Sequence, residues 1–154
     1  MQRYLFGVGL LITLLIVGFF KASFLAPSPQ LPTSNTLVVT SIDSIYDGDT
    51  FFVNIVGIPD VFGKRIGIRL AGIDTPEIRG KCPSEKLLAI KARDHLQNLL
   101  LNGAAIELRN VTRGKYFRLV ADVYIGSLNA SDSLINEGLA VRYTGKEVKQ
   151  GWCN

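Results

Sequence analysis

Apolar and polar residues alternate over short stretches in the first half of the chain beyond residue 36. Such alternation, with many β-branched and aromatic residues, is typical of half-buried strands, and three segments show it: residues 37–45, 50–56 and 65–73. Between the first two segments stands the pair Asp47-Gly48, which is a strong signal for a tight β-hairpin. Residues 57–60 contain a glycine and a proline and predict a turn before the third strand.

A longer spacing of apolar residues marks the segment at residues 84–102. Its apolar side chains recur every three or four positions, as in an amphipathic helix with one buried face: Leu88, Ala92, Leu96 and Leu99. Pro83 suits the first position of a helix, and Gly103 suits its end. In the rest of the chain we expect two more strands and then a short helix, at residues 104–109, 119–124 and 131–137.

The order of three strands, a helix, two strands and a helix predicts an α+β domain dominated by its sheet. A five-stranded barrel of the OB type with two packed helices is one fold that fits this order, and the pattern alone does not select it over other α+β folds. The chain has 154 residues, and residues 37–154 form the predicted domain. That length suffices for one modest core and is too short for two.

Residues 4–20 form an uncharged apolar run between Arg3 and Lys21. As a helix, the run would extend about 26 Å, close to the bilayer's hydrocarbon thickness of about 30 Å. We favour an uncleaved signal anchor at residues 1–21 over a cleaved signal peptide, because the run is long for a signal peptide and the residues after it match a cleavage site poorly. A buried core helix is the third interpretation.

The segment that follows, residues 22–36, holds half of the chain's prolines and predicts an extended linker. An anchor and a cleaved leader both place the domain outside the cytoplasm, attached to the membrane in the first case and periplasmic or secreted in the second. In an exported domain, Cys82 and Cys153 are candidates for a disulfide, with two free thiols as the alternative. With one histidine besides, the two cysteines are too few for a four-ligand zinc cluster.

The formal net charge of +4 is weak evidence for a nucleic-acid partner, because Arg3 and Lys21 flank the apolar run and the rest of the chain is nearly neutral. The local distribution of charge is more informative. Residues 109–118 carry four basic side chains, two aromatic rings and no acid. A basic loop with aromatic residues suits a phosphate and a stacked base, and a solvated hairpin tip is the alternative.

Acidic residues gather near the ends of two predicted strands. Asp47 and Asp49 stand in the first hairpin, where a plain turn is the alternative interpretation. Arg69 lies inside the apolar third strand, an unfavourable position for a guanidinium unless it faces an anion, and Asp74 and Glu77 follow it. Oxygen ligands from Asp49, Asp74 and a backbone carbonyl suit calcium better than zinc. A structural ion pair between Arg69 and one of these carboxylates is the alternative.

Four motifs together resemble the staphylococcal nuclease (thermonuclease) family in order and spacing. They are YDGDT at residues 46–50, RLAGIDTPE at residues 69–77, KYFR at residues 115–118 and NEGLA at residues 136–140. The resemblance covers roughly residues 38–143 and implies an OB-fold and a calcium-dependent nuclease. Two positions depart from the best-known member of the family, which has glycine at the place of Phe117 and an acidic residue at the place of Gly114.

The resemblance also implies a role for each matching position. The calcium ligands would be Asp49, Asp74 and the carbonyl oxygen of Thr75, with Asp47 beside the ion. The catalytic residues would be Arg69, Glu77 and Arg118. The residues that hold a substrate phosphate would be Lys115 and Tyr116, and the residue near the nucleotide would be Tyr143.

These residues predict hydrolysis of phosphodiester bonds in DNA or RNA, and the resemblance implies that cleavage leaves a 3′-phosphate. Arg69 and Arg118 would neutralise the charge that grows on the phosphate, and Glu77 is the natural candidate for the general base. A non-catalytic OB module that binds single-stranded nucleic acid is the alternative, and a membrane-tethered structural protein is a third class. We expect a monomer, tethered to the membrane through residues 4–20 if the leader is retained.

Overall fold

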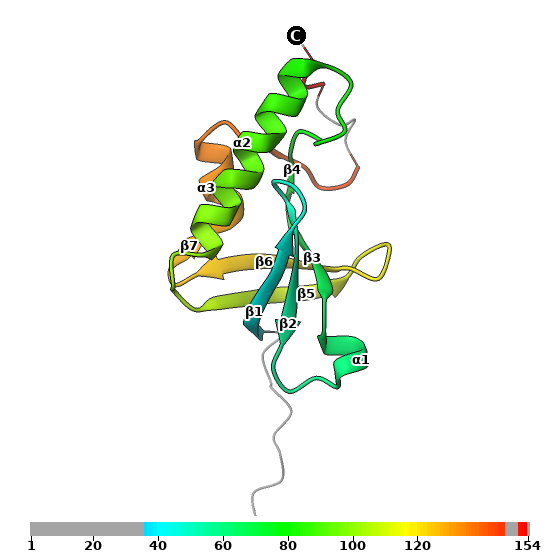
Figure 1. The fold of residues 1–154 in the computed structure, drawn as a ribbon, viewed down its shortest axis with the longest axis vertical. Coiled ribbons are helices and arrows are strands. Elements are labelled where there is room, and N and C mark those ends of the chain that lie inside the picture. Colours follow the sequence, from blue (N-terminus) through cyan, green and yellow to red (C-terminus); the bar gives the residue numbers. More distant parts are fainter. Residues whose placement is uncertain (1–35, 147–150, 154) are drawn as a thin grey trace, which may run out of the picture. The chain divides into compact units, whose positions relative to one another are not determined.

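Five strands of the computed structural model close into a barrel with helices packed against it, which confirms the predicted core architecture (Figure 1). The structure describes residues 36–146 and 151–153. The predicted N-terminal helix, and the linker up to residue 35, lie outside the described residues. Among the residues that are described, no helix has both the length and the apolar character needed to cross a bilayer.

The barrel strands are neighbours in the order β3-β2-β1-β5-β6, and they are β1 (Leu37–Ile45), β2 (Thr50–Ile55), β3 (Ile66–Leu70), β5 (Ile106–Arg113) and β6 (Leu119–Ile125). Strands next to one another in this order pair antiparallel. A parallel pairing, in which Ile68 faces Leu119, joins β3 to β6 and closes the barrel. Closure surrounds the core with backbone whose hydrogen bonds are satisfied between strands.

Apolar side chains from alternating strand positions fill the barrel, among them Phe51, Val53, Ile68, Leu70, Leu108 and Val123. The helices α2 (Pro83–Leu100) and α3 (Ala130–Asn136) lie at one end of the barrel, and the short helix α1 (Asp60–Gly63) lies at the other (Figure 1). Leu96 of α2 and Leu134 of α3 are fully buried in the same core. Each leucine of this kind contributes about 1.5–3 kcal/mol through burial.

The buried face of α2 is wider than the predicted stripe. Ala92 and Leu96 are buried as expected, whereas Leu88 and Leu99 lie at the margin of the core and are partly buried. Ala89 and Leu100 are buried as well, and the helix also contacts α3 through a 2.9 Å hydrogen bond between His95 Nε2 and Ser133 Oγ. A helix that packs against two elements buries more than one stripe of side chains.

The prediction of one continuous strand at residues 65–73 is wrong. β3 ends at Leu70, and Gly72 adopts a left-handed φ of 75°, a conformation that glycine takes at little cost. The next two residues form β4 (Ile73–Asp74), which leaves the barrel wall and pairs with β8 (Val141–Arg142). The chain therefore changes direction just before Asp74, one of the predicted calcium ligands.

The other differences concern short elements and strand ends. The pattern does not predict α1, β7 (Leu128–Asn129) or β8, because an element of two to four residues has no measurable periodicity. The strand predicted at residues 104–109 extends to Arg113, where its pairing with Leu119 continues the β5–β6 hairpin. This extension carries basic residues out to the hairpin tip.

Candidate active site

Two loops deliver the acidic side of the site. Asp49 ends the turn between β1 and β2, and Asp74 ends β4; they are 3% and 2% exposed. Arg69 reaches both from β3, since its Nη1 donates to Asp49 Oδ1 and its Nη2 lies 3.6 Å from Asp74 Oδ1. The anion that the half-buried guanidinium requires is therefore this pair of carboxylates, as the ion-pair interpretation of Arg69 proposed.

The turn that holds Asp49 packs directly on α2, and a glycine makes this packing possible. A Cβ on Gly48 would lie 2.6 Å from the Cβ of Ala92, which is closer than two carbon atoms approach. The N–H of Asp49 donates to Asp47 Oδ1 at 3.0 Å, and Thr75 Oγ1 donates to Asp49 Oδ2 at 3.2 Å. Asp49 is thus held both by its own turn and by the loop after β4.

Asp47 lies behind Asp49 and is 6% exposed. Burial, together with the negative charges of Asp49 and Glu77, raises the pKa of Asp47 from 3.8 to about 7. The carboxylates on the acidic side therefore repel one another, although they come from two different stretches of the chain. Repulsion of this kind is relieved by a proton or by a bound cation.

Arg118 connects the acidic side to the basic side through Thr50. Its Nη1 donates to Thr50 Oγ1 at 3.4 Å, and Thr50 Oγ1 donates to Asp49 Oδ1 at 2.8 Å. The aliphatic part of Arg118 passes over β3 at Gly67, where a Cβ would lie 2.9 Å from Arg118 Cγ. The Nε of Arg118 is buried and has no hydrogen-bond acceptor among the described residues.

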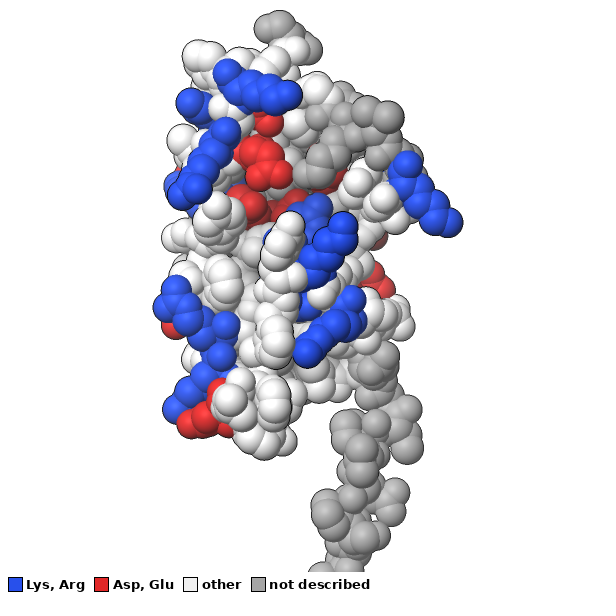
Figure 2. All heavy atoms as spheres, turned by 90° about the vertical axis from the view of Figure 1, so that its right-hand side faces the viewer, with Lys and Arg blue, Asp and Glu red and all other residues white. Residues whose placement is uncertain are grey.

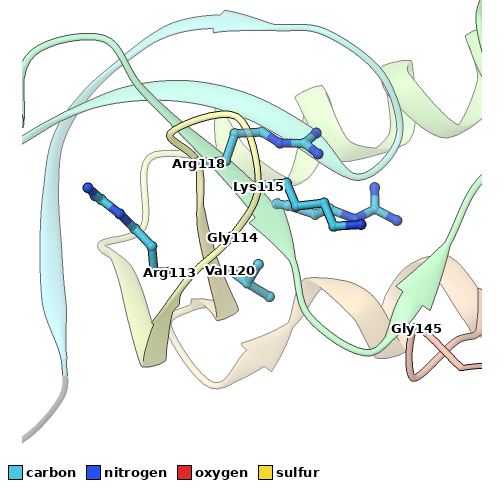
Figure 3. Close-up of a pocket in the computed structure, with 7 residues that line it drawn as sticks. Arg113, Gly114, Lys115, Arg118, Val120 and Gly145 are labelled. Carbon is cyan, nitrogen blue, oxygen red and sulfur yellow. The ribbon is translucent and has the colours of Figure 1, made fainter.

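A pocket of about 460 Å³ defines the basic side of the site (Figure 3). Four cationic residues and three small or apolar residues line it: Arg69, Arg113, Lys115, Arg118, Gly114, Val120 and Gly145. In Figure 3 the ends of Lys115 and Arg118 lie on the same side of the β5–β6 hairpin. A pocket lined by cations, without an acidic residue among those described, favours a polyanion such as a nucleic-acid backbone.

Two predicted substrate residues lie outside this lining. Tyr116 stands at the hairpin tip, where it is 87% exposed, and its ring centroid lies 5.7 Å from Arg118 Cζ, so the ring borders the pocket. Tyr143 is half-buried, and its N–H donates to the Gly72 carbonyl at 2.9 Å. The structure does not bring the Tyr143 side chain into the pocket lining, to which Gly145 contributes instead.

Glu77 belongs to a second pocket, of about 300 Å³, on the acidic side. Residues from the loop after β4, from α2 and from the C-terminal segment line it: Asp74, Thr75, Glu77, Lys81, Glu85, Gly151 and Trp152. Glu77 is exposed to solvent and lies beside Asp74 and Thr75, but it does not share a pocket with Arg118. Figure 2 shows acidic and basic side chains next to each other on one face of the molecule.

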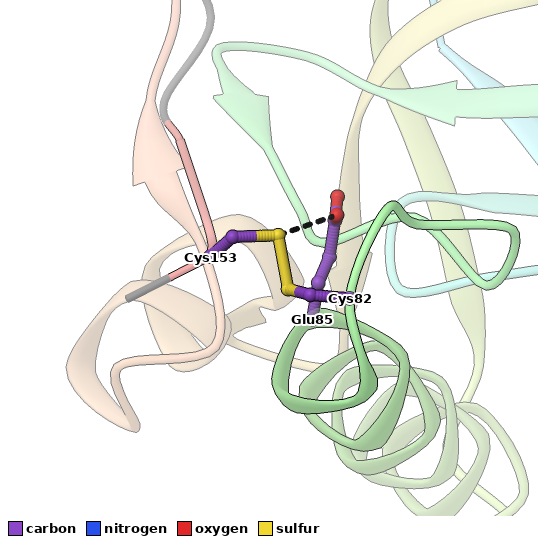
Figure 4. Close-up of side chains that lie close together, drawn as sticks. All are labelled: Cys82, Glu85 and Cys153. Carbon is purple, nitrogen blue, oxygen red and sulfur yellow. Dashed lines mark hydrogen bonds between the residues drawn. A yellow bond between two sulfur atoms is a disulfide. The ribbon is translucent and has the colours of Figure 1, made fainter.

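A disulfide between Cys82, at the start of α2, and Cys153 holds the C-terminal segment against the second pocket (Figure 4). The buried carboxylate of Glu85 lies beside it, since Glu85 Oε2 accepts a 2.8 Å hydrogen bond from the N–H of Lys81 and lies 3.6 Å from Cys153 Sγ. Cys82, Glu85 and Cys153 are close enough to suggest a metal cluster. Both sulfurs are engaged in the disulfide, however, so this group has no thiolate ligand to offer.

The acidic side fits a hard divalent cation. Asp49 and Asp74 supply carboxylate oxygens, and the buried Thr75 in the same loop supplies a backbone carbonyl as a third candidate. Calcium prefers oxygen donors of this kind and completes its coordination with water. The raised pKa of Asp47, which burial and the charge of Asp49 cause, agrees with this gathering of carboxylates. Because Arg69 already contacts both carboxylates, a bound cation would share them with this guanidinium.

This chain is similar to proteins of one nuclease family. Residues 67–151 match the family model described as staphylococcal nuclease homologue, and since this range covers more than half of the chain, the chain belongs to that family. The matched range includes Arg69, Asp74, Glu77 and Arg118 and begins after Asp49.

Two curated relatives carry nuclease names. A protein of Arabidopsis thaliana named staphylococcal-like nuclease is 32% identical over 90 residues, which are 58% of this chain and 26% of that protein. A protein of Schizosaccharomyces pombe named probable endonuclease is 30% identical over 95 residues, which are 57% of this chain and 41% of that protein. The chain thus spans less than half the length of either relative.

Three residues of the site have no role in the sequence analysis. Thr50 connects Arg118 to Asp49, and its place directly after the second aspartate of the first hairpin is the one hint of this. Gly67 is an isolated glycine inside an apolar strand, a pattern that often marks a close approach. Glu85 is an acid at a helical position that is buried with Ala89 and Ala92.

Proposed function

We propose that this domain is a calcium-dependent nuclease that hydrolyses phosphodiester bonds of DNA or RNA and leaves 3′-phosphate ends. The position of Arg69 carries the proposal. This residue contacts the buried Asp49 and Asp74, and it also lines the cationic pocket. A phosphate bound in the pocket would therefore lie next to the carboxylates that would hold the cation.

Asp49, Asp74 and the carbonyl of Thr75 would bind calcium, with Asp47 behind them. When bound, calcium would supply Lewis-acid stabilisation of a phosphate oxygen. Arg69 and Arg118 would bind non-bridging oxygens, because a planar guanidinium donates paired hydrogen bonds and stays charged at any working pH. Cations held in place before the reaction stabilise the charge that develops as water attacks.

Glu77 would accept a proton from the attacking water. Its exposed carboxylate lies where water reaches it, next to Asp74 and Thr75. The water oxygen would form the new bond to phosphorus while the bond from phosphorus to the 5′ oxygen breaks, which leaves the phosphate on the 3′ side. Lys115 and Tyr116 would hold a substrate phosphate from the hairpin, and Tyr143 would lie near the nucleotide at the margin of the site.

We further propose that the domain, residues 37–154, acts outside the cytoplasm and is tethered by residues 1–21 through the linker at residues 22–36. The disulfide between Cys82 and Cys153 supports an oxidising compartment. N-terminal sequencing of the mature protein, together with its partition into membranes, tests the tether. A mature chain that begins within the linker, recovered in the soluble fraction, would contradict the anchor.

The nuclease proposal is tested with the full chain purified in detergent and incubated with plasmid, single-stranded DNA and RNA, in calcium and in chelator. We expect cleavage in calcium alone, with product ends that a polymerase extends only after phosphatase treatment. Asp49→Asn should abolish cleavage, whereas Asp60→Asn, on an exposed acid of α1 outside the site, should not. Retention of single strands without cleavage would favour the binding module, and no interaction with any substrate would overturn both.

A further inference from the structure

The tip of the β5–β6 hairpin carries two pairs of an arginine and an aromatic ring. Arg118 pairs with Tyr116 at 5.7 Å between Cζ and ring centroid, and Arg113 pairs with Phe117 at 4.5 Å. In Figure 3 the Arg113 side chain points away from Lys115 and Arg118, to the other side of the hairpin. Because Arg113 and Arg118 both line the cationic pocket, the two adjacent rings border it at different arginines, Tyr116 at Arg118 and Phe117 at Arg113.

Both rings are held in an unfavourable backbone conformation without the compensation of burial. Tyr116 has a φ of 57° and Phe117 a φ of 62°, in the left-handed region that bulky residues avoid, and they are 87% and 61% exposed. Strain of this kind gathers at ligand-binding sites. The turn is closed by a 2.8 Å hydrogen bond from the Gly114 N–H to the Arg118 carbonyl, so the loop keeps the rings in place.

We propose that Phe117 and Arg113 form a nucleobase subsite, at the margin of the phosphate pocket, that stacks an unpaired base of the nucleotide flanking the cleaved one. The proposal rests on the proposed nuclease function. Arg113 lies over the Phe117 ring and holds it in one orientation, and more than half of the Phe117 surface stays open to a base. A base can reach this ring only when it is not stacked in a duplex, so the subsite selects single strands of DNA or RNA.

A strand that enters this subsite has its backbone across the hairpin. Its phosphate would lie in the pocket near Arg69, Lys115 and Arg118, and the next base would lie over Phe117, where Arg113 forms the margin of the same pocket. The affinity that the subsite adds therefore depends on substrate length. A substrate too short to reach from the phosphate pocket to Phe117 cannot bind both places at once.

The experiment measures KM of the full chain for single-stranded oligonucleotides of two, four and eight nucleotides, in a DNA series and an RNA series. We expect KM of the wild type to fall as the substrate becomes longer. At eight nucleotides, KM of Phe117→Gly should be about tenfold higher than KM of the wild type. Glycine accepts the left-handed φ, so the loop should keep its shape. Phe117→Trp should retain the length dependence, and Phe62→Ala, a matched change of an exposed ring on α1, should not alter it.

Abasic substitutions along the octanucleotide show which base contacts the ring. At one position, removal of the base should raise KM of the wild type about tenfold and leave KM of Phe117→Gly unchanged. Equal length dependence in both proteins, or no coupled position, would overturn the subsite. A loss confined to DNA or to RNA would also overturn it, because stacking uses the base and not the sugar.

Fluorescence anisotropy in chelator measures the binding of the intact and abasic octanucleotides to the wild type and to Phe117→Gly. This measurement separates the nucleobase subsite from the proposed nuclease function. If the chain binds the octanucleotide with the predicted coupling but cleaves nothing, the nucleobase subsite stands and the nuclease function fails. If the chain cleaves the substrate but shows no coupling between Phe117 and a base, in binding or in KM, the nuclease function stands and the nucleobase subsite fails.

Discussion

The acidic and basic sides of the candidate active site are built in opposite ways. On the acidic side, Asp47, Asp49 and Asp74 are at most 6% exposed. The first two lie in a turn that packs on α2, and Asp74 lies in the short strand β4 outside the barrel wall. On the basic side, Lys115 and Tyr116 project from an exposed hairpin tip. A small ion needs ligands fixed in advance, whereas a polymer is bound by groups that remain open to solvent.

Arg69 and Arg118 lie between these two sides and belong to both. Arg69 contacts the buried carboxylates and lines the cationic pocket, and Arg118 reaches Asp49 through Thr50 while its ring partner Tyr116 borders that pocket. The contrast between a rigid acidic side and an open basic side can be tested by changes placed on each side or at the junction.

The largest effect should follow from a change of the candidate general base. Glu77→Gln should lower kcat by about 10²–10⁴-fold and leave KM nearly unchanged, because the amide keeps the shape of the side chain and cannot accept the proton. Steady-state kinetics on a single-stranded oligonucleotide in saturating calcium measure both constants. Glu107→Gln, on a surface acid paired with Arg109, is the matched control. A near-normal rate would remove Glu77 from the role of base.

The disulfide should contribute to stability on the acidic side. Cys82→Ala combined with Cys153→Ala removes a cross-link between residues 71 positions apart. The chain-entropy model then predicts a loss of about 4 kcal/mol in the free energy of unfolding. Urea unfolding with and without reductant measures this loss. Reductant should destabilise the wild type to the level of the double variant and leave the variant unchanged; equal stability of both proteins without reductant would contradict the prediction.

A smaller effect is expected at the junction of the two sides. Gly67→Ala places a methyl group 2.9 Å from the present position of Arg118 Cγ, so the arginine must shift. We expect kcat to fall about tenfold, since a misplaced catalytic group lowers the rate more than it lowers binding. In an Arg118→Ala background the same change should have little further effect on kcat. Additive losses would show that Gly67 acts on the fold and not through Arg118.

The last effect concerns the dependence of stability on pH. The folded-state pKa of Asp47 is raised from 3.8 to about 7, so between these values the folded chain binds a proton that the unfolded chain releases. This carboxyl therefore lowers the free energy of unfolding progressively as pH rises from about 4 to 7. In chelator, Asp47→Asn should gain stability relative to the wild type as the pH is raised over that range, measured by urea unfolding at both ends. A constant difference would contradict the raised pKa.

Much of the fold and most of the site could be predicted from local sequence. The strand at Leu37–Ile45 and the helix that begins at Pro83 agree with the structure, because periodicity and helix-start signals act over a few residues. The motifs also identified the residues that the structure brings together around Arg69. The role of Thr50 and the path of Arg118 over Gly67 could not be predicted, since both depend on strands that are distant in sequence.

The amino-acid sequence by itself determined the long strands and helices, the charged residues and the family, because each of these depends on short patterns or on the order of such patterns. Only the tertiary structure decided how these parts meet. The parallel pairing of β3 with β6 closes the barrel, and the bend at Gly72 places Asp74 outside the barrel wall. The disulfide holds the C-terminal segment beside Glu77. Contacts of this range form when the whole core packs, and no local pattern specifies them.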